Sequence, residues 1–227
     1  MKSRNTIEEY HEYRDKIGNR TELYRIVAKM YGVESALYPG SHIDIAPSLV
    51  IPKIIYVDNF KGAINFFKNL DLIKEYIVQN KGYEKPCDIV FMDQDYTKEL
   101  NIEPVDLIIF QYAGLVGQAT KKHLKTGGIL LCNDSHGDAT LSKFDNYFEF
   151  IGVIGKNNRI IDNKLDDYFV LPRSKNVDLV KVKEKMKGPK YKLTAERRPI
   201  QNVPIWIQDL MAGKEAQEPD EDSKEYY

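Results

Sequence analysis

The sequence has few of the features that mark secreted or membrane proteins. Two cysteines, Cys87 and Cys132, occur among 227 residues, and both lie in apolar runs, so no disulfide framework is expected. No uninterrupted apolar run approaches the roughly 20 residues that cross a bilayer. The charged stretch from Met1 to Lys16 lacks the apolar segment of a signal peptide. These absences exclude a disulfide scaffold and predict a soluble, cytoplasmic protein that makes no use of a membrane.

The chain also lacks an excess of charge of either sign. Charged residues make up 30% of the sequence, yet the formal net charge is -1. A whole-molecule field that attracts nucleic acid or an anionic membrane is therefore excluded, and any electrostatic attraction has to be local. Hydrophobic residues make up 42% of the chain, which is enough for the core of one large domain.

Two phosphate-binding motifs are missing as well. A P-loop ends in Gly-Lys followed by Ser or Thr, and this combination occurs nowhere in the sequence. The dinucleotide fingerprint needs two further glycines soon after the first, but the next glycine after Gly40 is Gly62. A nicotinamide or flavin dinucleotide is therefore disfavoured, whereas a nucleoside ligand without a pyrophosphate is acceptable.

The hydrophobic pattern predicts strands that alternate with helices. Five short runs are almost wholly apolar, as expected of parallel strands that are covered on both faces. These runs are Ser35–Tyr38, Lys53–Val57, Cys87–Met92, Val105–Phe110 and Gly128–Cys132. Helical patterns occupy the first thirty residues, Lys61–Gly82 with a break near Asn69, and Ala113–Leu124. The alternation predicts an α/β protein with a doubly wound, mostly parallel sheet.

The composition changes along the chain and suggests four segments. Residues 1–34 are expected to be N-terminal helices, and residues 35–171 the α/β domain. At the edge of the sheet, Phe148–Ile154 and Tyr168–Leu171 are separated by a polar loop without helical period, which predicts an antiparallel hairpin.

The last two segments carry opposite charge. A basic extension is expected at 172–211, because Arg173 to Arg198 holds ten Lys or Arg against three acids. From Asp209 to Tyr227 there are seven acids against two lysines and few apolar residues, so 212–227 are expected to be a disordered acidic tail.

The strand ends are where a ligand is expected. In an open α/β sheet, ligands bind beyond the carboxyl ends of the strands, near the point where strand order reverses. Gly40 follows the first strand, where a glycine turn lets the backbone approach a ligand. Asp58 follows the second, eighteen positions later, close to the spacing of about 20 for an acid that accepts ribose hydroxyls. In the alternative interpretation, Gly40 serves a tight turn and Asp58 caps the next helix.

The order of these elements resembles that of class I S-adenosylmethionine (SAM)-dependent methyltransferases over roughly residues 20–171. The likeness rests on Tyr38-Pro39-Gly40-Ser41, on Asp58, and on the Gly127-Gly128 turn into the fifth strand. It implies a seven-stranded sheet with one antiparallel strand, and SAM as cofactor across strands one and two. The chain departs from the family where Pro39-Gly40-Ser41-His42 replaces Gly-x-Gly, and where Gln111-Tyr112 replaces the Asp/Asn-Pro-Pro-Tyr motif of amino-methylating enzymes.

The resemblance also assigns cofactor contacts. Gly40 would face the methionine part of SAM and Asp58 its ribose. The adenine would meet Asn59 and Phe60 at its edge and face, and Asp93 or Gln94 at its amino group. The full set of expected cofactor contacts is Gly40, Ser41, Asp58, Asn59, Phe60, Asp93, Gln94 and Gln111.

Catalytic candidates follow the fourth and fifth strands. Methyl transfer needs a positioned nucleophile, and a base where that nucleophile carries a proton. The candidates are Tyr112, Asp134 and His136; the histidine lies between Asp134 and Asp138, either of which would orient it and raise its pKa. The alternative is that Tyr112 only packs and that the loop is a turn of the usual Asn, Asp, Ser and Gly composition.

A second polar pair, His42 with Asp44, follows the first strand. Neither polar cluster supplies the three or four convergent ligands of a metal site, so no metal is expected.

Three functions are compatible with these residues. The leading hypothesis is a SAM-dependent methyltransferase that acts on a small molecule. The second is a degenerate methyltransferase-like scaffold or partner-binding module, which the atypical loop after Gly40 favours and the presence of Asp58 opposes. The third is a nucleic-acid methyltransferase that uses Arg173 to Arg198, although aromatic residues for base stacking are scarce in that run.

Overall fold

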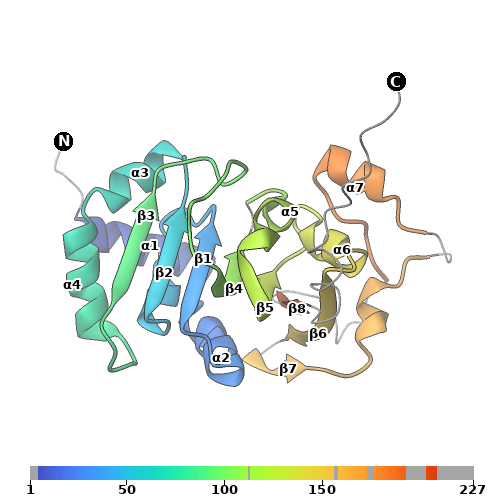
Figure 1. Cartoon of the computed structure of the whole chain (residues 1–227), viewed down its shortest axis with the longest axis horizontal. Helices are drawn as coiled ribbons and strands as arrows, with labels where there is room; N and C mark the ends of the chain where they lie inside the picture. Colours follow the sequence, from blue (N-terminus) through green and yellow to red (C-terminus); the bar gives the residue numbers. More distant parts are fainter. Residues whose placement is uncertain (1–4, 112, 156–157, 173–175, 193–202, 209–227) are drawn as a thin grey trace, which may run out of the picture.

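The strands form a single mixed sheet. A computed structural model describes residues 5–111, 113–155, 158–172, 176–192 and 203–208 of the chain (Figure 1). Its strands are β1 (Ser35–Pro39), β2 (Lys53–Val57), β3 (Asp88–Met92), β4 (Val105–Phe110), β5 (Leu124–Cys132), β6 (Phe148–Ile154), β7 (Ile160–Ile161) and β8 (Val203–Gln208). They lie in the order β3-β2-β1-β4-β5-β8-β6-β7.

The first five strands confirm the predicted fold class. Strands β1 to β5 pair in parallel, and β6, β7 and β8 pair with antiparallel neighbours. The chain runs outward from β1 through β2 to β3, and then returns to place β4 on the other side of β1. The strand order therefore reverses between β1 and β4, which is where open α/β sheets form their ligand crevice.

The helices are short; α1 to α5 lie before and between the parallel strands, and α6 and α7 follow β5. They are α1 (Thr6–Ile17), α2 (Thr21–Tyr31), α3 (Lys61–Phe67), α4 (Leu70–Asn80), α5 (Val116–Thr120), α6 (Asp138–Lys143) and α7 (Leu179–Lys185). Single turns of 3-10 helix occur at η1 (Ala46–Leu49), η2 (Lys121–His123) and η4 (Leu165–Phe169). The break predicted near Asn69 is confirmed, because Asn69 separates α3 from α4. In the described part of the chain, no helix is long and apolar enough to span a bilayer.

The alternation of side chains along the strands creates two cores, one on each face of the sheet. On β2, for example, Ile54 packs into the core under α1 to α4, and Ile55 packs into the core shared with α5 and α6. This alternation follows from the two-residue period of a strand. The result is three layers, with the sheet between two sets of helices (Figure 1).

The predicted antiparallel hairpin at the sheet edge is confirmed, but its second strand is β7 and not Tyr168–Leu171. Tyr168–Leu171 does not pair with β6; Tyr168 and Phe169 belong to the 3-10 turn η4. The ring of Phe169 packs edge-on against Phe150 of β6, at 5.2 Å between centroids. The antiparallel partners of β6 are instead β7 and β8. The aromatic residues that suggested a strand thus contribute packing rather than backbone pairing.

Strand β8 lies within the segment expected to be a basic extension. It enters the sheet between β5 and β6, so the sheet continues past residue 171, and the described residues form eight strands where seven were expected, with the two-residue β7 as the last in the order. The Gly127-Gly128 pair lies inside β5, where Gly127 has φ +76° and the pairing with β4 shifts register. The rest of the basic run is described from 176 to 192, and the expected acidic tail, 212–227, lies outside the described residues.

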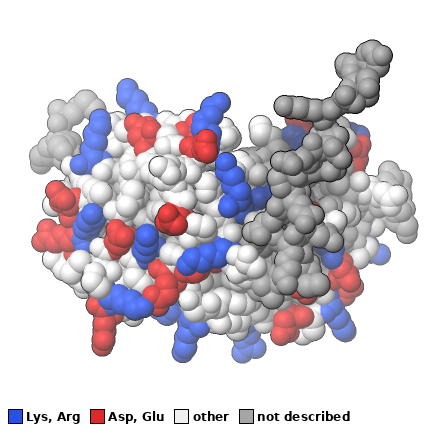
Figure 2. All heavy atoms as spheres, in the orientation of Figure 1, with Lys and Arg blue, Asp and Glu red and all other residues white. Residues whose placement is uncertain are grey.

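Figure 2 shows basic and acidic side chains interspersed on the visible face of the described residues. This distribution agrees with the formal net charge of -1.

The packing of β2 gives a test of the fold. Ile54 is fully buried, so Ile54→Ala should lower the free energy of unfolding by about 2–5 kcal/mol through lost contacts and the remaining cavity. Val90 on the neighbouring edge strand is 42% exposed, and Val90→Ala should cost less than about 1 kcal/mol. Urea unfolding of both variants measures the difference. Equal losses would contradict the placement of Ile54 in the core.

Candidate functional site

A cavity of about 360 Å³ lies at the point where strand order reverses. Gly40 and His42 line it from the loop after β1, and Gln111 lines it from the end of β4. Tyr13, Ile17 and Arg20, from α1 and the turn before α2, form its other wall. The N-terminal helices therefore complete a site that the sheet begins.

Gly40 holds the loop after β1 close to the loop after β4. Its φ is +62°, and a Cβ at this position would lie 2.2 Å from the Cβ of Ala113. Its N–H donates to the carbonyl of Val57 on β2 at 2.8 Å. Because any larger residue would collide with Ala113 and adopt a strained backbone, only glycine allows the two loops to meet here.

Asp58 ties the loops after β1 and β2 together. One carboxylate oxygen accepts the N–H of His42 at 2.8 Å, and the other accepts the N–H of Phe60 at 2.8 Å. The bond to Phe60 is a local turn contact, whereas the bond to His42 joins two strand ends. Asp58 is 7% exposed, so its carboxylate lies just beneath the protein surface at the carboxyl ends of the strands.

Aromatic rings line the edge beside Asp58. The rings of His42 and Phe60 lie 5.5 Å apart between centroids, and Tyr13 lies 4.9 Å from His42 on its other side. Phe60 is 57% exposed, which leaves part of its ring available to contact a ligand.

Two buried polar atoms at the cavity have no hydrogen-bond partner among the described residues. They are Nε2 of Gln111 and Nδ1 of His42. Burial lowers the pKa of His42, so its ring is neutral near pH 7 and has one nitrogen that accepts a hydrogen bond. Since an unpaired buried polar group is costly, both atoms suggest places where a ligand would bond.

A buried carboxylate lies behind the wall formed by Arg20. Asp44 accepts hydrogen bonds from the hydroxyls of Tyr24 at 2.9 Å and Tyr38 at 3.2 Å, and lies 3.6 Å from the Arg20 guanidinium. Burial raises the pKa of Asp44, although Arg20 and the two hydroxyls favour its charged form. The pair His42 and Asp44 singled out in the sequence therefore divides, with His42 at the cavity and Asp44 behind it.

The other predicted cofactor residues are placed as follows. Ser41 is buried, and its hydroxyl donates to the carbonyl of His42. Asn59 and Asp93 are exposed at the ends of β2 and β3. The amide of Gln94 donates to the carbonyl of Glu99 at 3.1 Å. Direct contacts thus connect Asp58, His42 and Phe60, whereas Asp93 and Gln94 occupy the neighbouring strand end.

The loop after β5 does not form the expected pair of a histidine with a carboxylate. Both oxygens of Asp134 accept hydrogen bonds from Thr140, and Asp138 accepts the N–H of Gly117 at 3.2 Å. Nδ1 of His136 lies 3.0 Å from the hydroxyl of Ser135 instead. The two aspartates thus hold the loop and α5, and neither hydrogen bonds to the histidine. Tyr112, the third catalytic candidate, lies outside the described residues.

The same loop contains two acids with strongly shifted pKa values. Burial raises the pKa of Asp134 to about 6, against the effect of its bonds to Thr140. Burial raises the pKa of Asp138 to about 8, and the charge of Asp134 adds to the shift. Asp138 is therefore largely protonated at neutral pH.

Four residues at the site were not identified from the sequence, namely Tyr13, Ile17, Arg20 and Tyr96. Tyr13, Ile17 and Arg20 come from the N-terminal helices, and no sequence signal indicates that these helices fold over the loop after β1. Tyr96, in the loop after β3, donates its hydroxyl to the carbonyl of Ala113 at 2.5 Å and so braces the loop after β4.

Within the described part of the chain, no group of three or more His, Cys, Asp or Glu side chains is placed to hold a metal ion.

Solved structures that resemble this fold include several methyltransferases. A methyltransferase from Geobacter sulfurreducens matches with a TM-score of 0.50 and 7% identity, over 92% of this chain and 90% of that one. The N-methyltransferase NodS from Bradyrhizobium japonicum matches with a TM-score of 0.48 and 10% identity, over 86% and 96%. No family model and no curated protein matches the sequence. The likeness is therefore one of fold: a parallel sheet in 3-2-1-4-5 order with antiparallel strands at one side, as in methyltransferases.

Asp138 gives a prediction about stability and pH. Its folded pKa of about 8 lies above the usual pKa of 3.8 for an aspartate, so the stability due to proton binding is present at low pH and is lost as pH rises through 8. Asp138→Asn keeps an acceptor for Gly117 and stays neutral. Between pH 6 and 8 the free energy of unfolding of the unmodified protein should therefore fall by about 1–2 kcal/mol more than that of Asp138→Asn.

The matched control is Asp71→Asn, which removes an exposed carboxylate from α4. Urea unfolding at each pH measures the three proteins. If Asp138→Asn and Asp71→Asn show the same pH dependence, Asp138 is not the titrating group.

Proposed function

We propose that this chain is a SAM-dependent methyltransferase that acts on a small molecule. The observation that carries the proposal is the convergence of Gly40, Asp58 and the exposed ring of Phe60 beside a cavity at the reversal of strand order. Each of the three supplies what a nucleoside ligand needs, namely backbone approach, a hydroxyl acceptor and a stacking face. The shared fold with methyltransferases supports the choice of SAM among nucleoside ligands.

The nucleoside half of SAM fits the ends of β1 and β2. Each oxygen of Asp58 accepts one backbone N–H, and an ionised carboxylate has about four acceptor sites, so two ribose hydroxyls can still donate to it. The face of Phe60 would stack on the adenine, with Asn59 at the ring edge. Asp93 or Gln94, at the end of β3, would meet the adenine amino group.

The amino-acid half of SAM fits the cavity between β1 and β4. Its carboxylate would bond to Arg20 and to the amide of Gln111, whose nitrogen has no partner among the described residues. Its ammonium would donate to the neutral ring of His42. The proposed arrangement would therefore satisfy both unpaired polar atoms at the site.

SAM supplies a methyl group on a sulfonium, which needs no activation by the protein. The chain's own contribution is to position the acceptor and to remove its proton where it carries one. We propose His136 for the base, because its ring is partly exposed, whereas both oxygens of Asp134 are bonded to Thr140. Asp134 would then act by holding the loop after β5. Tyr112 stays a proposed contact to the acceptor.

Titration calorimetry with SAM and S-adenosylhomocysteine tests the proposal directly. The unmodified protein should bind both with at least micromolar affinity, and Asp58→Asn should weaken both at least tenfold through weaker bonds to the ribose. The control Asp71→Asn on α4 should bind as the unmodified protein does. No binding at millimolar ligand would instead support the scaffold hypothesis.

Variants of Arg20 can distinguish binding of the amino-acid half of SAM from binding of its nucleoside half. Arg20→Gln should weaken SAM at least tenfold, because a charge-assisted bond is worth roughly 1.5–3 kcal/mol, and Arg20→Lys should restore part of the loss. Binding of 5′-methylthioadenosine, which lacks the amino-acid half, should not change. The control is Arg25→Gln on the exposed side of α2. Equal losses for both ligands would place Arg20 in a structural role beside Asp44.

A further inference from the structure

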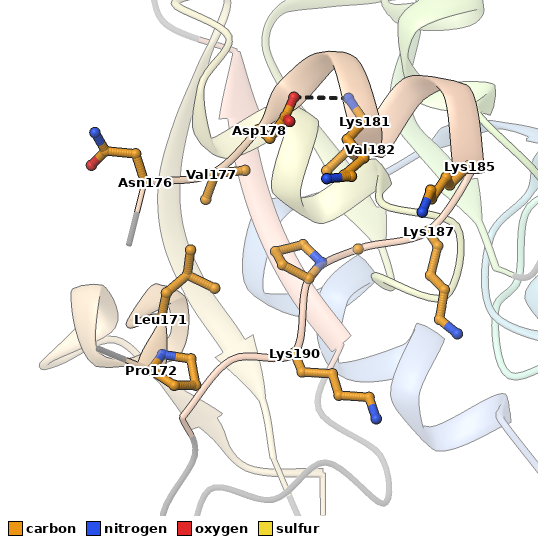
Figure 3. A pocket seen from close by; sticks show the side chains of 12 residues that line it. Leu171, Pro172, Asn176, Val177, Asp178, Lys181, Val182, Lys185, Lys187 and Lys190 are labelled. Carbon is orange, nitrogen blue, oxygen red and sulfur yellow. Dashed lines mark hydrogen bonds between the residues drawn. The ribbon is translucent and has the colours of Figure 1, made fainter. Parts of the chain in front are cut away.

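A second cavity, of about 570 Å³, lies beside α7 and outside the proposed cofactor site. It is formed by the segment that leads into α7, by α7 itself, and by the chain that follows it. Figure 3 shows Leu171 and Pro172 across the hollow from α7, with Lys187 and Lys190 on the returning chain. Its volume lies within the range of about 300–1,000 Å³ that is usual for small-molecule sites.

The charge of this cavity is strongly positive. Lys181 and Lys185 of α7 and Lys187 and Lys190 of the returning chain line it, against a single acid, Asp178. The Asp178 carboxylate already caps α7 by accepting the N–H of Lys181 at 3.0 Å. Among the described residues, none of the four lysines forms an ion pair. All four lysine side chains are exposed, so this face of the chain attracts anions to the hollow.

Apart from Asn176 and Gly188, the remaining lining residues are apolar. Leu171, Pro172, Val177, Val182 and Pro189 contribute carbon surface. Val182 is buried against the loop after β5, because a Cβ on Gly137 would lie 2.5 Å from its side chain. A ligand that consists only of a charged group would leave this apolar surface in contact with water. A ligand that also has an apolar body would cover it.

The walls of the cavity are attached to the rest of the fold. The N–H of Lys192 donates to the carbonyl of Val170 at 2.7 Å, which closes the segment from 170 to 192 into a loop. The hydroxyl of Tyr191 lies 2.8 Å from that of Thr140 on α6, and its ring packs against Phe169. Gly188 lies against Asp134, where a Cβ would approach the carboxylate to 2.0 Å. These contacts attach the chain that follows α7 to η4, to α6 and to the loop after β5.

We propose that this cavity binds a small organic anion with an apolar body and a doubly charged group, such as the phosphate monoester of a hydrophobic alcohol. The four lysines recognise the charge, and the valine, leucine and proline side chains cover the body. A nucleic acid fits less well, because none of the lining residues is an aromatic on which a base would stack. The proposal is independent of SAM, since neither cavity shares a lining residue with the other.

Titration calorimetry of the full chain with 1-naphthyl phosphate tests the site. The probe should bind at one site per chain, and inorganic phosphate and 1-naphthol, which each carry one half of its chemistry, should bind at least tenfold more weakly. The double variant Lys181→Gln with Lys187→Gln should weaken the probe at least tenfold. The matched control, Lys29→Gln with Lys122→Gln, removes two exposed lysines from α2 and η2 and should not change binding. Thermal unfolding confirms that both double variants are folded.

Three results would overturn the proposal. One is the absence of binding by the full chain at millimolar 1-naphthyl phosphate. Another is an equal loss of affinity in the control variant, which would show attraction to surface charge in general. The third is tighter binding of a single-stranded oligonucleotide than of the probe, lost in Lys181→Gln with Lys187→Gln, which would assign the lysines to nucleic acid. SAM binding measured in the same variants should be unchanged. Failure of the proposed anion site can therefore be distinguished from failure of the proposed cofactor site.

Discussion

The buried carboxylate of Asp44 connects the N-terminal helices to the sheet. The cavity between the ends of β1 and β4 depends on this connection. It accepts hydrogen bonds from Tyr24 on α2 and Tyr38 on β1, and it faces Arg20 between the two helices. Loss of one partner from such a buried group costs several kcal/mol, which favours one arrangement of helices and sheet. In that arrangement Arg20 and Tyr13 face Gly40, and the crevice of an open α/β sheet becomes a walled cavity.

The sequence predicted the parallel half of the sheet well, because each strand there is a short apolar run that is buried on both faces. Lys53–Val57 and Val105–Phe110 match β2 and β4 residue for residue. The antiparallel half was predicted less well. Tyr168–Leu171 has the composition of a strand, yet Tyr168 and Phe169 belong to a helical turn. The ring of Phe169 packs on β6. Strand β8 has an apolar, strand-like sequence that was included in the expected basic extension, and no local pattern specifies that it pairs with β5 and β6.

The candidate site was predictable to the extent that it is built from strand ends. Gly40, Asp58 and Gln111 follow β1, β2 and β4, and topology alone places them at one edge of the sheet. Arg20, Tyr13 and Tyr96 reach the same edge from helices and loops whose position depends on tertiary packing. For His136, the composition of the loop after β5 was compatible with a hydrogen bond to a neighbouring carboxylate. Whether that bond forms depends on the direction of each side chain. Asp134 turns to Thr140, and Asp138 turns to Gly117.

The late position of β8 in the chain has a consequence for how the protein folds during synthesis. β8 pairs with β5 and with β6, both of which are synthesised well before it. Until residues 203–208 leave the ribosome, these two strands lack a shared neighbour, and the backbone N–H and C=O groups on the edges that pair with β8 stay open to other chains. Sheets that depend on such distant pairing fold slowly. The nascent chain therefore has a period in which its parallel half is complete but its antiparallel half is vulnerable to aggregation.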